Sequence, residues 1–320
     1  MRFIVYGAGA IGGVIGARLF QGGHDVTLIA RGAHYEAIRD HGLRFETPDE
    51  SVTLPIPVAA RPADVKFAEG DVVLLAMKTQ DTAAALAELS AAAPPDVVVV
   101  SAQNGVENER LALRLFPRVY GVCVVLPAEH LEPGVVQTYM APVTGTLDVG
   151  RYPSGDDETA VALAAAFAGS SFEASARVNV MDYKYGKLLG NLGNAVQVVI
   201  APGEPGREAV RLAREEGAAV LRAAGIKAAE VTSALGSARP VGGHDRLGGS
   251  SYQSLRRGTG TIESDYLNGE IVLLGREHGV ATPVNELLRR LANQMAREGR
   301  SPGLMTPEEF LAALDGHAPR

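Results

Sequence analysis

The feature that most constrains the fold is a glycine-rich segment that directly follows the first apolar run of the chain. The run Phe3–Tyr6 predicts a buried strand, and Ile11–Gln21 has the apolar spacing of a helix. The segment at their junction reads Gly7-Ala8-Gly9-Ala10-Ile11-Gly12. Gly7 permits a tight turn, Gly9 lets the backbone approach an anion, and Gly12 allows close packing of helix on strand. The spacing predicts a dinucleotide pyrophosphate at the helix N-terminus; a glycine-rich turn without a ligand is the alternative.

Short apolar runs alternate with helix-period segments through the first half of the chain. Strands covered on both faces by helices are apolar throughout, so this alternation predicts an α/β fold with a doubly wound parallel sheet. The runs Val135–Met140 and Thr146–Gly150 are expected to pair as an antiparallel extension. A helix at Glu158–Ala168 and a short strand near Phe172–Ala176 follow. The main predicted elements are strands at Phe3–Tyr6, Asp25–Ala30, Val72–Met77, Val97–Ser101 and Val119–Leu126 and helices at Ile11–Gln21, Thr82–Ala91 and Glu107–Leu115.

The spacing of apolar residues along the chain changes near residue 177. From Val178 onward the apolar spacing is that of long helices, and no run there predicts a strand. The polar, glycine-rich segment Arg239–Gly260 predicts a loop with one short helix near Ser251–Arg257. We therefore predict an α/β domain over 1–177 and an all-α domain over 178–320. The long helices of the second domain are expected at Asp182–Ile200, Gly206–Ala224, Glu263–His278 and Val284–Arg297.

Length and charge limit the classes of protein to which the chain can belong. Its 320 residues are enough for two ordinary cores, which agrees with a division near residue 177. Lys and Arg number 30 against 37 Asp and Glu, and the resulting charge of −7 argues against nucleic acid as a partner. The single cysteine, Cys123, excludes a disulfide within the chain. No apolar run approaches about 18 residues or resembles a signal peptide, so we expect a cytoplasmic protein with no membrane partner.

The end of the second predicted strand distinguishes between two forms of the dinucleotide. Sites for NAD usually place an acidic residue there to bind the ribose 2′-hydroxyl. This strand ends instead at Ala30, and Arg31 follows it with no acid at the tip. An arginine can bind a 2′-phosphate through its planar fork of donors, whereas a carboxylate would repel that phosphate. Arg31 thus predicts NADPH or NADP as the cofactor; a solvated surface arginine is the alternative.

Two more strand tips carry polar side chains. Lys78 follows the strand Val72–Met77, and Asn104 follows the strand Val97–Ser101. Ligands of such sheets bind beyond the carboxyl ends of the strands, so both side chains are candidates for one crevice. Each also has an ordinary explanation, because Asn104 precedes a glycine and fits a turn, and Lys78 fits a solvated strand end.

Polar side chains on the predicted helix Asp182–Ile200 are candidates for the chemistry. Lys187, Asn191 and Asn194 stand at i, i+4 and i+7, which puts them on one stripe of that helix. Such a stripe could cover either a polar cleft or solvent. Lys184 lies near the same stripe, so the spacing alone does not choose between the two lysines.

Further candidates lie in the glycine-rich loop and in the helix that follows it. Glu263 comes shortly after Thr261, a suitable N-cap, and the helix dipole favours a carboxylate in a first turn whatever its function. Ser250 and Ser251 lie in the loop itself. The chain lacks a spaced histidine–cysteine metal set, a G-x-S-x-G elbow and a G-x-x-x-x-G-K-[ST] loop. We therefore expect no metal ion, no serine hydrolase and no nucleotide hydrolysis.

In their order along the chain, these motifs resemble those of the ketopantoate reductase family, whose enzymes are also called 2-dehydropantoate 2-reductases. The resemblance extends from Gly7 to about Pro283. Each motif alone is weak, whereas their order and spacing together are specific. The matching features are GAGAIG at 7–12, Arg31, Lys78 in AMKTQ, QNG at 103–105, KLxxN at 187–191, the serine pair at 250–251 and ExDxxNG at 263–269.

This resemblance implies an NADP-binding Rossmann domain followed by an all-helical catalytic domain. It implies reduction of 2-dehydropantoate (ketopantoate) to pantoate by NADPH, on the route to pantothenate. It also implies that Lys187, rather than Lys184, is the proton donor, and that Glu263 is the second catalytic residue. The family pattern puts the substrate at Asn104, Lys187, Asn191 and Ser251, and the cofactor at Gly7, Ala8, Gly9, Ala10, Ile11, Gly12, Arg31, Lys78, Asn104 and Glu263.

Departures from the family pattern fall on the substrate side. Ala195 stands where a family asparagine is expected, another expected asparagine falls near Pro205, and Gly260 replaces a common arginine. The residues after Ser251 also differ from the usual S-M-L-Q-D. These departures motivate one alternative, an NADPH-dependent reductase of a different 2-oxo acid. A second alternative, from a different class, is a non-catalytic NADPH-sensing protein. A homodimer is compatible with the sequence, which does not report oligomeric state.

Overall fold

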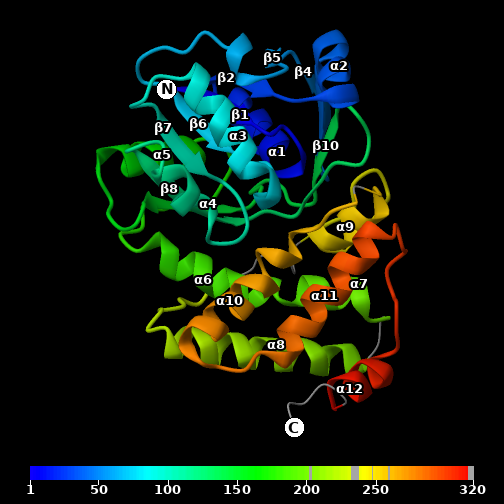
Figure 1. Ribbon diagram of the computed structural model, residues 1–320. Helices are drawn as coiled ribbons and strands as arrows, with labels where there is room; N and C mark the ends of the chain where they lie inside the picture. Colours follow the sequence, from blue (N-terminus) through cyan, green and yellow to red (C-terminus); the bar gives the residue numbers. More distant parts are fainter. Residues whose placement is uncertain (202–203, 232–237, 247, 259, 316–320) are drawn as a thin grey trace. The chain divides into compact units, whose positions relative to one another are not determined.

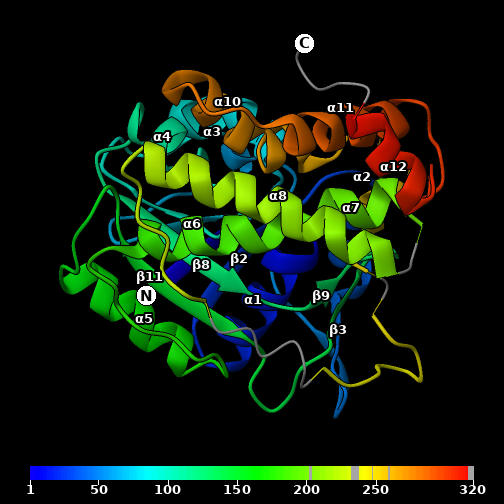
Figure 2. The ribbon, with the colours of Figure 1, turned by 90° about the horizontal axis from the view of Figure 1, so that it is seen from below.

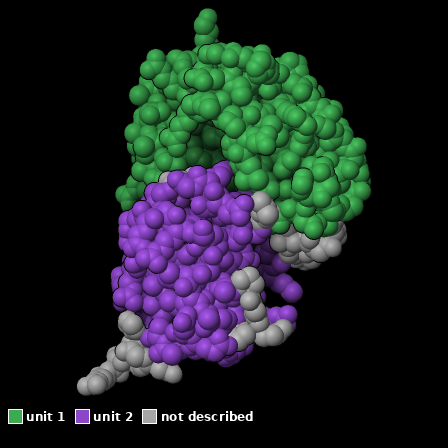
Figure 3. Space-filling model, turned by 90° about the vertical axis from the view of Figure 1, so that its right-hand side faces the viewer, with its two compact units in different colours: residues 1–181, 232–246 green, residues 182–231, 247–320 purple. Residues whose placement is uncertain are grey.

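The computed structural model describes residues 1–201, 204–231, 238–246, 248–258 and 260–315. The chain divides into two compact units, which Figure 3 colours separately. The first unit takes residues 1–181 and 232–246, and the second takes 182–231 and 247–320. The predicted domains, 1–177 and 178–320, differ from these units mainly because a segment from the second half of the chain packs with the first unit. Along the described chain, no helix combines the length and apolar character needed to cross a bilayer.

A central sheet with the strand order β11-β8-β7-β6-β1-β2-β5 forms the middle of the first unit (Figure 1). Its neighbouring strands run parallel except β11, which is antiparallel to β8 at one edge. The strand order reverses beside β1, so the predicted doubly wound sheet is confirmed. The elements are β1 (Arg2–Tyr6), β2 (Asp25–Ile29), β5 (Val58–Ala59), β6 (Val72–Leu75), β7 (Val98–Ser101), β8 (Val119–Val125) and β11 (Thr146–Arg151), with helices α1 (Ala10–Gln21), α2 (Gly32–His41), α3 (Thr79–Ala92), α4 (Asn108–Leu113) and α5 (Glu158–Ala168).

Helices cover both faces of this sheet because its strands carry apolar residues on both sides. In β1, Phe3 and Val5 belong to a core shared with α1 and α5, which lie on one side of the sheet (Figure 2). Ile4 points the other way and belongs to a second core, which includes Leu86 of α3 and Phe116 just after α4. Successive residues of a strand alternate between its faces, so both cores draw on every central strand.

A second, smaller sheet packs against α1, and the sequence does not predict it. The predicted pairing of Val135–Met140 with Thr146–Gly150 is wrong, because β10 pairs with β3 and β9, whereas β11 pairs with β8. Burial explains the difference: β10 is buried on one face only, with Val136 against Gly13 of α1, whereas four successive residues of β11 are buried. The order of the small sheet is β4-β3-β10-β9, with β3 (Leu43–Glu46), β4 (Ser51–Leu54), β9 (Ala128–Glu129) and β10 (Val135–Thr138).

Two other parts of the first unit also depart from the prediction. Helix α2 was not predicted because it lacks an apolar stripe: Ile38 is its only buried residue. The stretch Phe172–Ala176 contacts β11 through isolated bridges at Glu173 and Ala176 rather than as a regular strand. The predicted helix Glu158–Ala168 matches α5, whose N-cap Asp157 accepts a hydrogen bond from the Ala160 backbone N–H.

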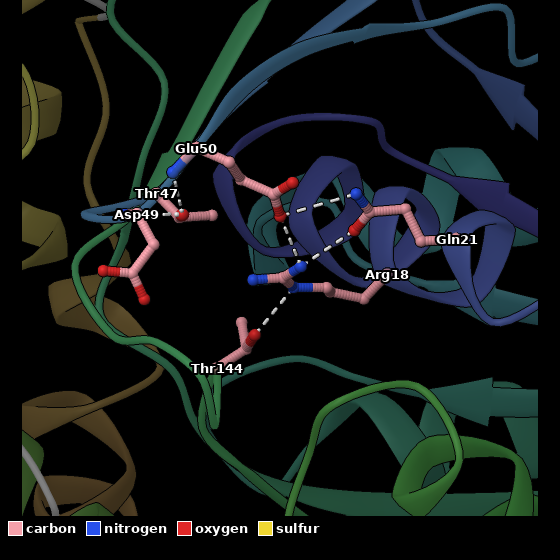
Figure 4. A network of polar contacts seen from close by, with 6 residues as sticks. All are labelled: Arg18, Gln21, Thr47, Asp49, Glu50 and Thr144. Carbon is pink, nitrogen blue, oxygen red and sulfur yellow. Dashed lines mark hydrogen bonds and ion pairs between the residues drawn. The ribbon is translucent and has the colours of Figure 1, made fainter.

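A buried arginine fixes α1 to its surroundings (Figure 4). Arg18 donates from Nε to Thr144 Oγ1 at 2.8 Å, and from Nη1 to Gln21 Oε1 and Glu50 Oε1, each also at 2.8 Å. Its guanidinium lies 4.7 Å from the centre of the Phe45 ring. Only 8% of Arg18 is exposed, so its charge is compensated within the fold. These contacts hold α1, whose N-terminus carries the glycine motif, against the β3–β4 hairpin and the loop before β11.

The second unit is helical, as predicted. Helix α8 packs against α7, α10, α11 and α12, and α7 also packs against α9. The predicted helix Asp182–Ile200 is interrupted, because α6 ends at Asn191 and α7 begins at Gly193. The helices are α6 (Val180–Asn191), α7 (Gly193–Val199), α8 (Glu204–Ala223), α9 (Ser250–Arg256), α10 (Asn268–His278), α11 (Pro283–Arg297) and α12 (Pro307–Asp315).

Buried side-chain amides hold the junction between α6 and α7. Asn268, the first residue of α10, donates from Nδ2 to the Leu192 carbonyl at 3.2 Å and to Asn285 Oδ1 at 3.0 Å. Asn285 of α11 donates in turn to the Ala213 carbonyl at 3.0 Å and to Glu216 Oε2 at 2.8 Å. Both asparagines are fully buried. Polar groups at such depth depend on these protein partners, so the network ties the junction to three other helices.

We expect Asn268→Ala to lower the free energy of unfolding by about 2–3 kcal/mol, because it leaves the Leu192 carbonyl and Asn285 Oδ1 without a donor at a buried site. Urea denaturation followed by circular dichroism measures this change. Asn293→Ala is the matched control, since Asn293 also donates an amide hydrogen bond, to Asp265 Oδ1 at 2.8 Å, but on the exposed surface. Equal losses in the two variants would contradict the importance of the buried network.

Candidate functional site

The glycine motif forms a tight turn at the carboxyl end of β1. The backbone N–H groups of Gly7 and Ala8 both donate to the Ile29 carbonyl at the end of β2, at 3.1 and 3.2 Å. Gly7 has a φ of +99°, and a Cβ there would lie 2.6 Å from the Met77 backbone nitrogen. Backbone conformation and the neighbouring strand end therefore both require glycine at position 7.

The other two glycines of the motif have opposite surroundings. A Cβ on Gly12 would overlap the Gly7 carbonyl oxygen and would lie 2.8 Å from Ala76 Cβ, so α1 packs directly on the strand ends. Gly9 is the N-cap residue of α1, and a Cβ on it would meet no atom within 4 Å. Open space at a helix N-terminus suits a pyrophosphate, because the first N–H groups of the helix have no intrahelical acceptor. The turn therefore fits a dinucleotide.

Arg31 lies at the end of β2, where it is the N-cap residue of α2. Its side chain is 83% exposed, and Nη2 lies 3.4 Å from Oδ1 of Asp81 in the first turn of α3. Most of the Arg31 guanidinium is thus accessible to an anion, with the Asp81 carboxylate as a competitor. At the nearby end of β1, the Tyr6 hydroxyl donates a hydrogen bond to Glu88 at 2.8 Å, and burial together with this carboxylate raises the pKa of Tyr6.

A buried polar network joins the ends of β6 and β7. Gln103 donates from Nε2 to the Met77 carbonyl at 2.9 Å and to Thr82 Oγ1 at 2.8 Å. Asn108 donates to the Asn104 carbonyl at 3.0 Å, and its Oδ1 accepts from Thr82 Oγ1 at 2.8 Å. These bonds fix the backbone of both segments that follow the strands.

The network brings together the two segments that carry Lys78 and Asn104. Both residues are half-buried, and the residue after Lys78, Thr79, lies with its Oγ1 3.4 Å from the Asn104 carbonyl. The two predicted positions therefore share one edge of the sheet. Gln103 belongs to the QNG segment at 103–105 but was not itself predicted as a site residue, and Asn108, the first residue of α4, was not predicted.

In the second unit, α6 carries Lys187 and Asn191. Lys187 is half-buried, whereas Lys184, three residues earlier, is only 4% exposed. The Nδ2 group of Asn191 is buried and has no hydrogen-bond partner among the described residues. Asn194, the third residue of the predicted stripe, lies beyond the interruption at Leu192, on α7.

The serine pair lies in the first turn of α9, which is attached to α7. The Gly249 backbone N–H, just before this helix, donates to Gln197 Oε1 at 2.9 Å. A Cβ on Gly249 would lie 3.0 Å from Asn194 Oδ1, so Asn194 also borders the start of α9. Ser251 is 2% exposed, and the Ser250 hydroxyl is buried without a partner among the described residues. The structure thus brings the serines beside Asn194 and Gln197, and Gln197 was not a candidate in the sequence analysis.

Glu263 begins a short 3₁₀ helix, η3 (Glu263–Asp265), rather than the first turn of a long α-helix. Its carbonyl accepts hydrogen bonds from the Tyr266 and Leu267 backbone N–H groups, each at 3.0 Å. The predicted helix Glu263–His278 is therefore wrong at its start, because α10 begins only at Asn268. Leu267, with φ −109° and ψ −83°, departs from helical geometry and separates η3 from α10. Glu263 itself is 5% exposed.

The candidate residues fall into two sets, one in each unit. In the second unit, Asn191 Nδ2 and the hydroxyls of Ser250 and Ser264 are buried and have no hydrogen-bond partner among the described residues. In the part of the chain that the structure describes, no group of three or more His, Cys, Asp or Glu could hold a metal ion. The first set is Gly7–Gly12, Arg31, Lys78 and Asn104, and the second is Lys187, Asn191, Ser251 and Glu263.

Two family models match the chain and together cover most of it. Residues 3–154 match the model described as ketopantoate reductase PanE/ApbA, and residues 179–296 match the model described as ketopantoate reductase PanE/ApbA C terminal. Among curated relatives, the 2-dehydropantoate 2-reductase of Halobacterium salinarum is 29% identical over 310 residues, which cover 93% of this chain and 100% of that protein.

Two solved structures share the fold over 93% of this chain and 99% of their own chains. One is the PanE/ApbA family ketopantoate reductase from Ralstonia eutropha JMP134, which is 30% identical with a TM-score of 0.80. The other is D-mandelate dehydrogenase in a ternary structure with NADH and anilino(oxo)acetate, which is 23% identical with a TM-score of 0.80. At that identity the second likeness is one of fold alone.

Proposed function

The chain belongs to the ketopantoate reductase family, and from this premise we propose that it reduces 2-dehydropantoate to pantoate with NADPH. The observation that carries the proposal is the glycine turn, in which position 9 alone is open at a helix N-terminus while positions 7 and 12 are packed against backbone. A turn of this kind serves to hold the pyrophosphate of a dinucleotide. When bound, the reduced nicotinamide supplies the hydride that adds to the C2 carbonyl of the substrate.

The residues of the second unit supply the acid and the substrate contacts in this proposal. Negative charge develops on the carbonyl oxygen as the hydride arrives, and the Lys187 ammonium stabilises that charge and delivers the proton. Glu263 orients Lys187 and the bound cofactor. The Asn191 amide, whose Nδ2 is buried without a partner among the described residues, donates to the substrate together with Ser251 and Asn104.

Arg31 and Lys78 complete the proposed cofactor site in the first unit. The exposed Arg31 guanidinium binds the 2′-phosphate that distinguishes NADPH from NADH, and Lys78 contributes a second positive charge beyond the end of β6, on the other side of β1. The carboxylate of Asp81, 3.4 Å from Arg31, moderates this preference because it repels the same phosphate. NADPH is therefore the proposed cofactor, with weaker use of NADH.

We expect Arg31→Ala to raise the Kd of NADPH by about 10–100-fold, the loss typical of a charge-assisted hydrogen bond, with little change for NADH. Fluorescence titration of each dinucleotide measures both constants. Arg39→Ala is the matched control, because Arg39 is exposed on the same helix and pairs with Asp40 at 2.7 Å. Equal weakening of NADPH and NADH by Arg31→Ala would refute the 2′-phosphate contact.

Steady-state kinetics with 2-dehydropantoate test the reaction itself. We expect turnover with NADPH, and a kcat/KM for 2-dehydropantoate well above that for other 2-oxo acids. Comparable values across several 2-oxo acids would favour a reductase of different specificity, which the departures at Ala195 and Gly260 also motivate. Binding of NADPH without turnover of any 2-oxo acid would favour a non-catalytic NADPH-sensing protein.

A further inference from the structure

His34, in the first turn of α2, connects two segments that lie far from it in the sequence. Its Nδ1 accepts a hydrogen bond from the Gly134 backbone N–H at 2.8 Å, and its Nε2 lies 2.7 Å from the Ala8 carbonyl oxygen. Because Nδ1 acts as an acceptor, the proton of the neutral ring is on Nε2. His34 therefore donates to the carbonyl of Ala8, the second residue of the glycine motif.

The backbone N–H group that donates to His34 Nδ1 belongs to Gly134, a position whose conformation favours glycine. Gly134 has a φ of +77°, and a Cβ on it would lie 2.9 Å from the Cβ of Ala37 on α2. Its carbonyl accepts a hydrogen bond from the Arg44 backbone N–H of β3 at 2.9 Å. Glycine at this position lets the loop before β10 come close enough to α2 for its N–H to reach His34.

The surroundings of His34 favour the neutral ring that these two bonds require. Burial lowers the pKa of His34. The ring centre of His130 lies 4.1 Å away, and Nδ1 of His130 is 2.9 Å from the Val135 carbonyl, so that ring also has a fixed orientation. The two imidazole planes are tilted by 46°, so the rings are in contact without being parallel, between α2 and the loop before β10.

We propose that His34 is a positioning residue for the dinucleotide: it holds the glycine turn and the N-terminus of α2, which carries Arg31, in fixed relation to each other. The inference rests on the proposed function. The Ala8–Gly9 peptide is trans, so anchoring the Ala8 carbonyl also fixes the direction of the Gly9 N–H. The turn therefore keeps the open side of Gly9 in one orientation before the pyrophosphate binds.

Two substitutions separate the two hydrogen bonds of His34. The amide nitrogen of glutamine reaches the position of Nε2, so His34→Gln keeps the donor to the Ala8 carbonyl. The amide oxygen of asparagine reaches only the position of Nδ1, so His34→Asn keeps only the acceptor for the Gly134 N–H. We expect His34→Asn to raise the Kd of both NADPH and NADH by about 3–10-fold, the effect of one hydrogen bond. His34→Gln should stay within about 2-fold of the wild type on the same basis. For both variants, kcat at saturating NADPH should change by less than about 2-fold, because neither bond touches the reacting atoms.

Titration of NADPH and NADH fluorescence, the melting temperature and kcat are measured together, with the exposed His41→Asn of the same helix as control. A wild-type Kd in His34→Asn, or equal weakening in His34→Gln, overturns the inference while the proposed function stands. A fall of kcat and melting temperature in His34→Asn with no change in either Kd shows a merely structural role and also overturns it. Failure of the wild-type protein to bind either dinucleotide overturns the inference and the proposed function together.

Discussion

Replacing Lys187 by alanine is expected to lower kcat by about 10²–10⁴-fold, the usual cost of removing a general acid. The charge that develops on the substrate oxygen would then have no ammonium to stabilise it and no nearby proton. The Kd of NADPH should stay nearly unchanged, because the glycine turn and Arg31 belong to the first unit, whereas Lys187 belongs to the second. Steady-state measurement of NADPH oxidation with 2-dehydropantoate gives kcat, and pre-steady-state measurement gives the rate of the hydride-transfer step.

Two other lysines of the second unit make this prediction specific. Lys227 is 78% exposed and lies 3.5 Å from Asp182, so Lys227→Ala removes an ammonium without affecting the proposed site. Lys184, which the helical spacing alone does not distinguish from Lys187, is the more demanding comparison. Full activity in Lys187→Ala, or an equal loss in Lys184→Ala with the fold intact, would rule out Lys187 as the proton donor.

The glycine turn predicts opposite effects for two alanine substitutions that are three residues apart. Gly9→Ala adds a Cβ that meets no atom within 4 Å, and the φ of −69° at this position suits any residue. The unfolding free energy should therefore change by less than about 0.5 kcal/mol, as for an ordinary surface substitution. Because the added methyl occupies the space proposed for the pyrophosphate, the Kd of NADPH should rise by about 10²-fold, which is the scale of an overpacked contact.

Gly12→Ala should instead destabilise the fold. Its Cβ would overlap a backbone oxygen of the same turn, which cannot move away as a flexible side chain could. We expect a loss of about 3 kcal/mol in unfolding free energy, at the upper end of what one inserted methyl costs in a packed interior. Thermal and urea denaturation measure it beside Gly9→Ala. Normal NADPH binding in Gly9→Ala would remove the main support for the proposed cofactor site.

The central sheet could be predicted because its strands are apolar on both faces. Runs such as Val72–Leu75 and Val98–Ser101 are fully buried, and a run of that kind leaves few alternatives to a strand between helices. The glycine motif could also be predicted, because the spacing of its glycines depends on how the turn packs against the strand just before it. Both signals depend on residues close together in the chain.

The parts that could not be predicted depend on distant contacts or on weak patterns. Strand β4 has no buried residue and α2 has only Ile38, so neither shows the periodicity that a sequence pattern needs. The interruption between α6 and α7 could not be predicted either. Leu192 keeps a helical φ of −57° and ψ of −29°, and its carbonyl accepts a hydrogen bond from Asn268, 76 residues away. In the site, the pairing of Gln103 with Thr82 likewise arises only when two strands meet.

The path of the polypeptide through the two units limits how this protein can be divided. The chain passes from one unit to the other after residues 181, 231 and 246, so neither unit corresponds to a single continuous stretch. A fragment that stopped at residue 181 would lack Arg239, which pairs with Asp49 at 2.8 Å and donates to the Ala141 carbonyl at 3.0 Å. Gene fusion or shuffling of the amino-terminal half alone would therefore transfer an incomplete folding unit, without the segment 238–246 that completes the first unit.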